Sequence, residues 1–162
     1  MVPEVTMAKT ELKAEVGGRI LITRIFDAPR ERVFKAITDP KRIPHWWGPR
    51  AYTTIVDRMD VRPGGSWRFV QRDADGKEEA FHGVYHTILP SKQLAYTFEW
   101  EGMPGHVLLE TVTLEDLPGG RTRMLDSLVF QTVEDRDGML QTGMEGGASE
   151  STERLAELLR VG

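Results

Sequence analysis

Apolar and polar residues alternate with a period of two through the middle of the chain, from Tyr52 to Gln131. The clearest run extends from Leu94 to Glu101, where Leu, Tyr, Phe and Trp alternate with Ala, Thr and Glu. Such alternation is typical of a strand with one buried face, and turns containing Gly or Pro divide the segment at regular intervals. We therefore predict about six antiparallel strands, at residues 52–61, 66–72, 77–89, 94–101, 106–116 and 121–131.

The residues before this segment predict a hairpin and two short helices. Two β-rich runs, 12–16 and 19–26, are joined by Gly17-Gly18, which is a hairpin signal. A helix is expected to begin near Pro29 and to end at Asp39-Pro40, with a second short helix over Lys41 to Pro44. Residues 1–18 are expected to be a partly ordered N-terminal extension, and residues 19–162 a single domain.

The C-terminal segment, Val133 to Gly162, has the period of a helix. One face of that helix carries Leu140, Met144, Ala148, Ser151, Leu155 and Leu158. The first half also carries Gly138, Gly143, Gly146 and Gly147, each of which costs about 1 kcal/mol in a helix interior relative to alanine. We expect this half either to pack closely against another element or to face an open space.

Together these elements predict an α+β fold. A long meander with one aromatic-rich face needs a cover, and the C-terminal helix is the only predicted element long enough to provide it. Gly83, inside the strand expected at 77–89, predicts a bulge or a close approach of another element.

Composition narrows the classes of function. The chain has 162 residues, a net charge of -4 and interspersed charges, which argues against a nucleic-acid partner. It has no cysteine, which excludes disulfides, thiolate metal sites and a cysteine nucleophile. No stretch is apolar enough for a signal peptide or a membrane span, so we expect a cytoplasmic protein, monomeric or homodimeric.

Several motifs together resemble a known family. They are Ile22–Pro40, Trp46-Trp47-Gly48-Pro49, Asp60–Phe69, Phe81–Tyr85, Tyr96-Thr97-Phe98, Glu134–Met139 and Gly143–Gly147. In these motifs the chain resembles the proteins homologous to the C-terminal domain of the heat-shock-protein ATPase activator. That family belongs to the START-like (SRPBCC) superfamily, which includes polyketide cyclases and the birch-pollen allergen.

The resemblance implies a helix-grip fold. In that fold a curved antiparallel sheet of about six to seven strands wraps around a long C-terminal helix, with two short helices after the first strand. The gap between the sheet and the helix is commonly a cavity for an apolar ligand in this superfamily. The family does not by itself assign a ligand or a reaction, because fold does not imply function.

Aromatic residues of like parity are the best candidates to line such a cavity. The predicted ligand contacts are Trp46, Trp47, Trp67, Phe69, Phe81, Tyr85, Tyr96, Phe98, Trp100, Met124, Met139 and Met144. An apolar cavity with few polar groups is typical of a site for a hydrophobic ligand. The alternative is that these side chains simply fill the core, as aromatic residues do in most small domains.

Trp46 and Trp47 stand next to each other in a loop before Gly48-Pro49. We expect one indole in the core and the other near the surface or the cavity mouth, since neighbours in extended chain point to opposite sides. They could form a gate or a partner-binding patch. We favour the interpretation that they form a structural plug that anchors the short helices.

Candidates for acid–base or metal chemistry are few. His106, Asp126 and Glu99 are the candidate catalytic residues, and a buried Asp126 would have a raised pKa. We nevertheless expect Asp126 to face solvent on the convex side of the sheet, or to pair with Arg68 or Arg123. His82 and His86 have the even spacing of one strand face, but no third ligand completes a motif, so we expect neither a metal nor a cofactor.

Three hypotheses about function follow. The leading one is a non-enzymatic START-like domain that binds a small apolar molecule between the sheet and the helix. The second is a chaperone-interaction module with an exposed patch near Trp46-Trp47; ATPase activation is not expected, because only the C-terminal domain of the activator is matched. The third is an enzyme of the cyclase or dehydratase type that uses His106, Asp126 or Glu99 as acid or base.

Overall fold

A single antiparallel sheet contains every strand that the structure describes. A computed structural model describes residues 9–161, and residues 1–8 and 162 lie outside that description. The eight strands run in the order β1-β2-β8-β7-β6-β5-β4-β3 across the sheet. The strands are β1 (Glu11–Glu15), β2 (Arg19–Phe26), β3 (Thr53–Met59), β4 (Ser66–Arg72), β5 (Glu78–Leu89), β6 (Gln93–Trp100), β7 (Val107–Leu117) and β8 (Arg121–Phe130). The helices are α1 (Arg30–Thr38), the 3-10 helix η1 (Ile43–His45), α2 (Val133–Gln141) and α3 (Met144–Arg160).

The N-terminal hairpin explains why the expected number of six to seven strands was too low. Both of its arms belong to the sheet, because β1 pairs with β2 and β2 pairs with β8. The short helices α1 and η1 therefore follow the second strand rather than the first. The helix expected at Lys41–Pro44 is a single 3-10 turn at Ile43–His45. Residues 1–8 of the predicted N-terminal extension lie outside the described residues, whereas residues 11–15 form β1.

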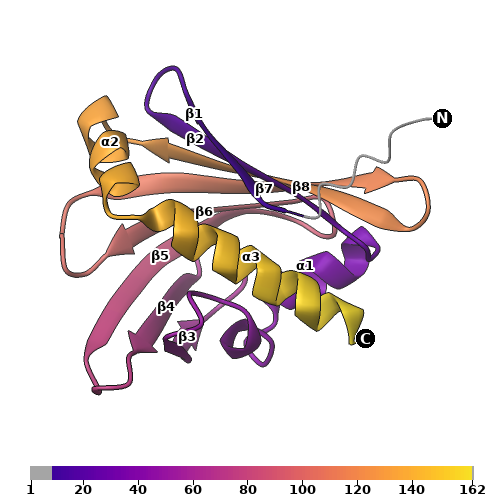
Figure 1. Ribbon diagram of the computed structural model, residues 1–162, viewed down its shortest axis with the longest axis horizontal. Helices are drawn as coiled ribbons and strands as arrows, with labels where there is room; N and C mark the ends of the chain where they lie inside the picture. Colours follow the sequence, from indigo (N-terminus) through magenta and orange to yellow (C-terminus); the bar gives the residue numbers. More distant parts are fainter. Residues whose placement is uncertain (1–8, 162) are drawn as a thin grey trace.

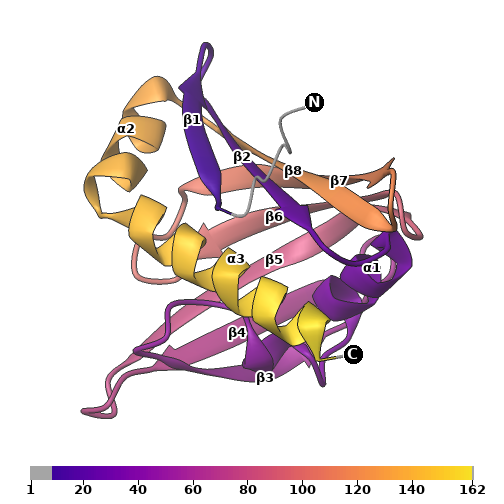
Figure 2. The same cartoon turned by 45° about the vertical axis from the view of Figure 1, so that its right-hand side comes forward.

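The C-terminal segment forms two helices, not the one long helix that its period predicts. α2 ends at Gln141, and Gly143 stands before α3 with a φ of +81°. Glycine adopts positive φ at little cost, so it allows the chain to change direction here. Figure 1 shows α3 crossing the sheet, with α2 near one of its ends and α1 near the other. Figure 2 shows the same helix lying over β4 to β6.

The apolar core between the sheet and the helices has two parts. The larger cluster includes Phe26, Val33 and Leu155, and the smaller one includes Ile20 and Leu128. All four buried residues of α3 lie at or after Thr152 in its C-terminal half, and α2 has none. The C-terminal half of α3 is therefore held firmly against the core. The residues of α3 before Thr152 contribute no buried side chain.

Candidate functional site

A pocket with a volume of about 820 Å³ lies between the concave face of the sheet and α3. Ligand pockets in proteins usually measure between about 300 and 1,000 Å³, so this one is large enough for a drug-sized molecule. Part of its wall is the N-terminal half of α3, which presents Gly146 and Gly147 to it, and Gly143 just before the helix also lines it. The lining also contains all of the predicted ligand contacts, namely Trp46, Trp47, Trp67, Phe69, Phe81, Tyr85, Tyr96, Phe98, Trp100, Met124, Met139 and Met144. Their contact with a ligand stays a prediction.

Strand register brings the aromatic side chains together. Phe81 of β5 is the partner of Phe69 on one side and of Trp100 on the other, so the three share a face of the sheet. The ring centroids of Phe81 and Phe98 are 5.4 Å apart. This centroid distance falls within the range in which aromatic rings attract one another. The result is a continuous aromatic wall on one side of the pocket.

The close approach predicted at Gly83 is present, and it positions Trp67. The Nε1 atom of Trp67 donates a hydrogen bond to the carbonyl oxygen of Thr97 at 3.2 Å, directly over Gly83. A Cβ atom at position 83 would lie 1.8 Å from that oxygen and 2.6 Å from the indole nitrogen. Only glycine therefore leaves room for this hydrogen bond, which satisfies the polar atom of a fully buried indole.

Both adjacent tryptophans line the pocket, and neither stands out as an exposed indole. Trp46 donates from Nε1 to the carbonyl oxygen of Ala36 at 2.9 Å. Trp47 lies edge-on to Phe69, with the ring centroids 5.1 Å apart. Both side chains are half-buried and pack against the larger core cluster. Neither indole therefore lies on the open surface, and the expectation that one of them lies near the cavity mouth stays a prediction.

Hydrogen bonds from α3 hold the tryptophan loop in place, which sequence reasoning missed. The Arg154 guanidinium donates to the carbonyl oxygens of Gly48 at 2.9 Å, Trp47 at 3.3 Å and Pro44 at 3.4 Å. The Ser151 hydroxyl donates to the carbonyl oxygen of Trp46 at 3.3 Å and accepts from the backbone N–H of Gly48 at 3.2 Å. Burial lowers the pKa of Arg154. These hydrogen bonds join the loop to the helix along one rim of the pocket.

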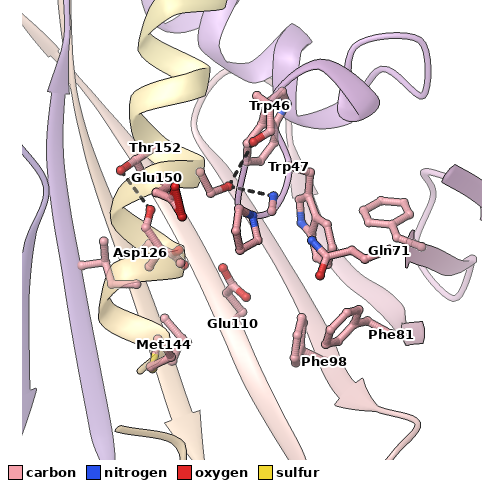
Figure 3. A pocket seen from close by; sticks show the side chains of 18 of the residues that line it. Trp46, Trp47, Gln71, Phe81, Phe98, Glu110, Asp126, Met144, Glu150 and Thr152 are labelled. Carbon is pink, nitrogen blue, oxygen red and sulfur yellow. Dashed lines mark hydrogen bonds between the residues drawn. The ribbon is translucent and has the colours of Figure 1, made fainter. Parts of the chain in front are cut away.

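Two carboxyl groups, Glu110 of β7 and Asp126 of β8, interrupt the otherwise apolar wall. Glu110 is the cross-strand partner of Tyr96, and Asp126 is the partner of Val112, two residues further along β7. The two carboxyl groups therefore lie on the same, concave face. Figure 3 shows both side chains reaching into the pocket from the sheet, opposite Thr152 of α3.

The prediction that Asp126 faces solvent or pairs with an arginine is therefore wrong. Its two expected partners have other carboxylates: Arg68 contacts Glu101 at 2.8 Å and Asp57 at 3.4 Å, and Arg123 contacts Glu115 at 3.4 Å. The alternation of β8 decides the matter, because Met124 and Leu128 lie two residues on either side of position 126 and face the core. Asp126 shares their face.

Burial governs the protonation of this pair. It raises the pKa of Asp126 well above its ordinary value, and the neighbouring Glu110 charge adds to the effect. Burial likewise raises the pKa of Glu110, and its interactions with Asp126 and Tyr96 oppose that rise. The pKa of the Tyr96 phenol is raised as well, first by burial and then by the two acids. Asp126 Oδ1 is buried and has no hydrogen-bond partner among the described residues.

Sequence reasoning did not select Glu110, although the sequence contained a signal. Leu108, Val112 and Leu114 are buried and have the same parity as Glu110 in β7. A carboxylate within such an inward-facing series is the pattern that marks a polar group in a core or a pocket. The same test, applied to β8, would have placed Asp126 correctly.

The remaining acid–base candidates lie elsewhere. The Nδ1 atom of His106 is 2.9 Å from an Asp135 carboxylate oxygen, and neither residue lines the pocket. The Glu99 carboxylate accepts a hydrogen bond from the backbone N–H of Gly105 at 2.9 Å, also outside the pocket. None of the four histidines lines the pocket. Among residues 9–161, no group of three or more His, Asp or Glu side chains is arranged to hold a metal ion.

With this geometry in view, comparison with known proteins identifies the family. Residues 27–160 match the family described as Activator of Hsp90 ATPase homolog 1-like protein. The chain belongs to this family. The match spans both short helices, the six strands from β3 to β8, and the C-terminal helices. A comparison with curated proteins gives no match.

Solved structures of similar proteins agree with the family's fold. Protein CV1439 from Chromobacterium violaceum is 27% identical, with a TM-score of 0.79 over 88% of this chain and 96% of its own. A protein from Arthrobacter aurescens is 26% identical, with a TM-score of 0.86 over 94% of this chain and 92% of its own. The AHSA1 protein from Silicibacter pomeroyi is 22% identical, with a TM-score of 0.73 over 88% and 98%, which shows the fold alone. The family and these structures are consistent with the START-like helix-grip superfamily. Within residues 9–161, none of the helices is long and apolar enough to cross a membrane.

Proposed function

We propose that this member of the family binds a small, largely apolar molecule in the pocket between the sheet and α3. The observation that supports the proposal is an 820 Å³ space bounded by aromatic and methionine side chains. Cores of small domains are packed to crystal-like density, with few voids larger than a water molecule. A space of this size in a folded chain is costly unless something occupies it, and removing an apolar ligand from water supplies the stabilisation that side chains do not.

The structure gives less support to the chaperone-interaction hypothesis and to the enzyme hypothesis. A chaperone-binding patch at Trp46-Trp47 would need exposed indoles, and both are half-buried and hydrogen-bonded or stacked within the pocket wall. The enzyme hypothesis loses His106 and Glu99, which lie outside the pocket, and retains Asp126. An acid–base role would then fall to Asp126 together with Glu110.

Binding is tested by titrating the purified chain with N-phenylnaphthylamine, an uncharged apolar dye whose fluorescence rises in apolar surroundings. Native mass spectrometry of the same preparation tests for a co-purified molecule. We expect saturable binding of one dye molecule per chain.

A pair of matched variants locates the binding. Ala148→Phe adds a ring to the pocket side of α3, whereas Glu145→Phe adds the same ring at an exposed position of the same helix. We expect the first variant to weaken dye binding by at least about tenfold, and the second to change it less than about twofold. Binding that is absent in the parent chain, or equal in the two variants, would contradict the proposal.

A further inference from the structure

The charges that line the pocket are all of one sign. Its lining contains the carboxylic side chains Glu79, Glu110, Asp126 and Glu150, and no lysine, arginine or histidine among the described residues. Glu79 accepts a hydrogen bond from Trp100 Nε1 at 2.8 Å, and Glu150 is exposed. Of these four carboxylic side chains, Glu110 and Asp126 are therefore the two in the interior that have no tryptophan partner.

These two groups have more acceptor capacity than the protein fills. The Tyr96 hydroxyl interacts with Glu110, and the two carboxyl groups interact with each other. Asp126 Oδ1 has no partner among the described residues. A buried polar atom without a partner is costly, so a donor brought by a ligand would stabilise both the complex and the wall.

The neighbouring rings suit a positive charge. Tyr96 lies opposite Glu110 in the register, and Tyr85 lies opposite Tyr96, with ring centroids 6.0 Å apart. A cation beside an aromatic face is attracted to it, most strongly where water is excluded. An anion at the same place would find no lining cation to pair with among the described residues, and it would be repelled by whichever of the two acids is ionised.

We propose that the pocket selects an apolar molecule that carries a protonated amine, with the nitrogen beside Glu110 and Asp126 and the apolar body against the aromatic wall. This inference rests on the proposed function and names the ligand class. An ammonium group offers several N–H donors and one positive charge. It therefore fills the free acceptor and balances the single negative charge that the pair carries when its two carboxyl groups share one proton. A neutral carbonyl group would do neither, because it brings no donor and no charge.

Three probes of the same apolar body test this inference: phenylbutylamine, phenylbutanol and phenylbutyrate, titrated calorimetrically into the full chain near neutral pH. We expect the amine to bind at least about tenfold more tightly than the alcohol, and the carboxylate to bind more weakly than the alcohol. In the double variant Glu110→Gln/Asp126→Asn, the preference for the amine should fall below about threefold while the alcohol still binds. Glu150→Gln, at an exposed position of the lining, should keep the preference.

The outcomes separate this inference from the proposed function. If N-phenylnaphthylamine or the alcohol binds but the amine has no advantage, the amine inference is overturned and the binding function stands. An amine preference that survives in the double variant also overturns it, because the charge would then be recognised elsewhere. If neither the dye nor any of the three probes binds, both proposals fail. Dye binding by the double variant shows that its pocket is intact.

Discussion

Glu110 and Asp126 occupy positions where the alternation of β7 and β8 would otherwise place apolar side chains. Burying an ionised carboxylate costs free energy, and for this reason burial raises the pKa of each of these two groups. Natural sequences keep such residues where a local rule is broken for a purpose. The purpose proposed here is recognition of a polar group on a ligand, and the cost itself is measurable without any ligand.

Asp126→Asn is expected to change how stability depends on pH. Asp126 keeps its proton in the folded chain at pH values where the unfolded chain has lost it, so wild-type stability falls as the pH rises above the unfolded pKa of 3.8 toward the raised folded pKa. Each pKa unit of difference corresponds to about 1.4 kcal/mol. The asparagine variant should therefore gain stability relative to the wild type as the pH rises above 3.8, as measured by urea unfolding at several pH values. A constant difference across these pH values would show that Asp126 is not buried in the pocket wall.

Glu101→Gln provides a control of opposite sign. The hydrogen bond from Arg68 lowers the pKa of Glu101 to about 2, with a further contribution from His82. A depressed folded pKa stabilises the protein above the unfolded pKa of 4.5, and this contribution is lost as the pH falls toward 2. The variant should be less stable than the wild type near neutral pH, and the difference should narrow on acidification.

At the scale of elements, the glycines of the C-terminal segment have different roles that the sequence alone does not distinguish. Gly143 separates α2 from α3 with a φ of +81°, whereas Gly138 lies within α2, and a Cβ atom there would meet no other atom within 4 Å. The helical period runs through both positions, so periodicity predicts one continuous helix. The break depends on a positive φ at Gly143. Glycine permits this angle but does not require it, so the sequence alone does not predict the break.

Alanine substitutions tell the two roles apart. Gly138→Ala should stabilise the chain by about 0.5–1 kcal/mol, because alanine lowers the entropy of the unfolded state and fits a helix. Gly143→Ala should destabilise it by about 1–2 kcal/mol, because an L side chain is strained at positive φ. Thermal unfolding of the two variants side by side measures both effects. A stabilising Gly143→Ala would show that the segment is one continuous helix, as its period suggests.

The sequence predicted the strands better than it predicted the site. Strand positions follow from alternation, and the shared face of Phe69 and Phe81 follows from parity, so the aromatic wall could be anticipated. The same parity rule places Glu110 and Asp126 on the inner face of the sheet. Charged residues usually face solvent, however, and that general tendency led to the wrong prediction for Asp126. The contact of Arg154 with the tryptophan loop could not be predicted, because it joins residues 106 positions apart in the chain, and no local pattern encodes it.

At the scale of the whole molecule, α3 has one half anchored in the core and one half over the pocket. Thr152, Leu155, Ala156 and Leu159 are buried, whereas the four residues from Met144 to Gly147 and all of α2 contribute no buried residue. Local opening is easiest where few apolar contacts are lost. If the pocket binds a ligand as proposed, we expect entry by displacement of α2 and the first turn of α3, while the rest of the fold stays closed.

Hydrogen exchange tests this route. Amides of residues 137–147 should exchange at least about tenfold faster than those of 155–160 in the free chain, since the anchored half opens only with the core. Addition of N-phenylnaphthylamine should slow exchange mainly in 137–147, because a bound molecule stabilises the closed state that it contacts. The central strands β7 and β8 serve as the internal reference and should change little. Equal protection along both helices in the free chain would mean that α3 opens as one unit, and entry would then have to occur at the tryptophan loop.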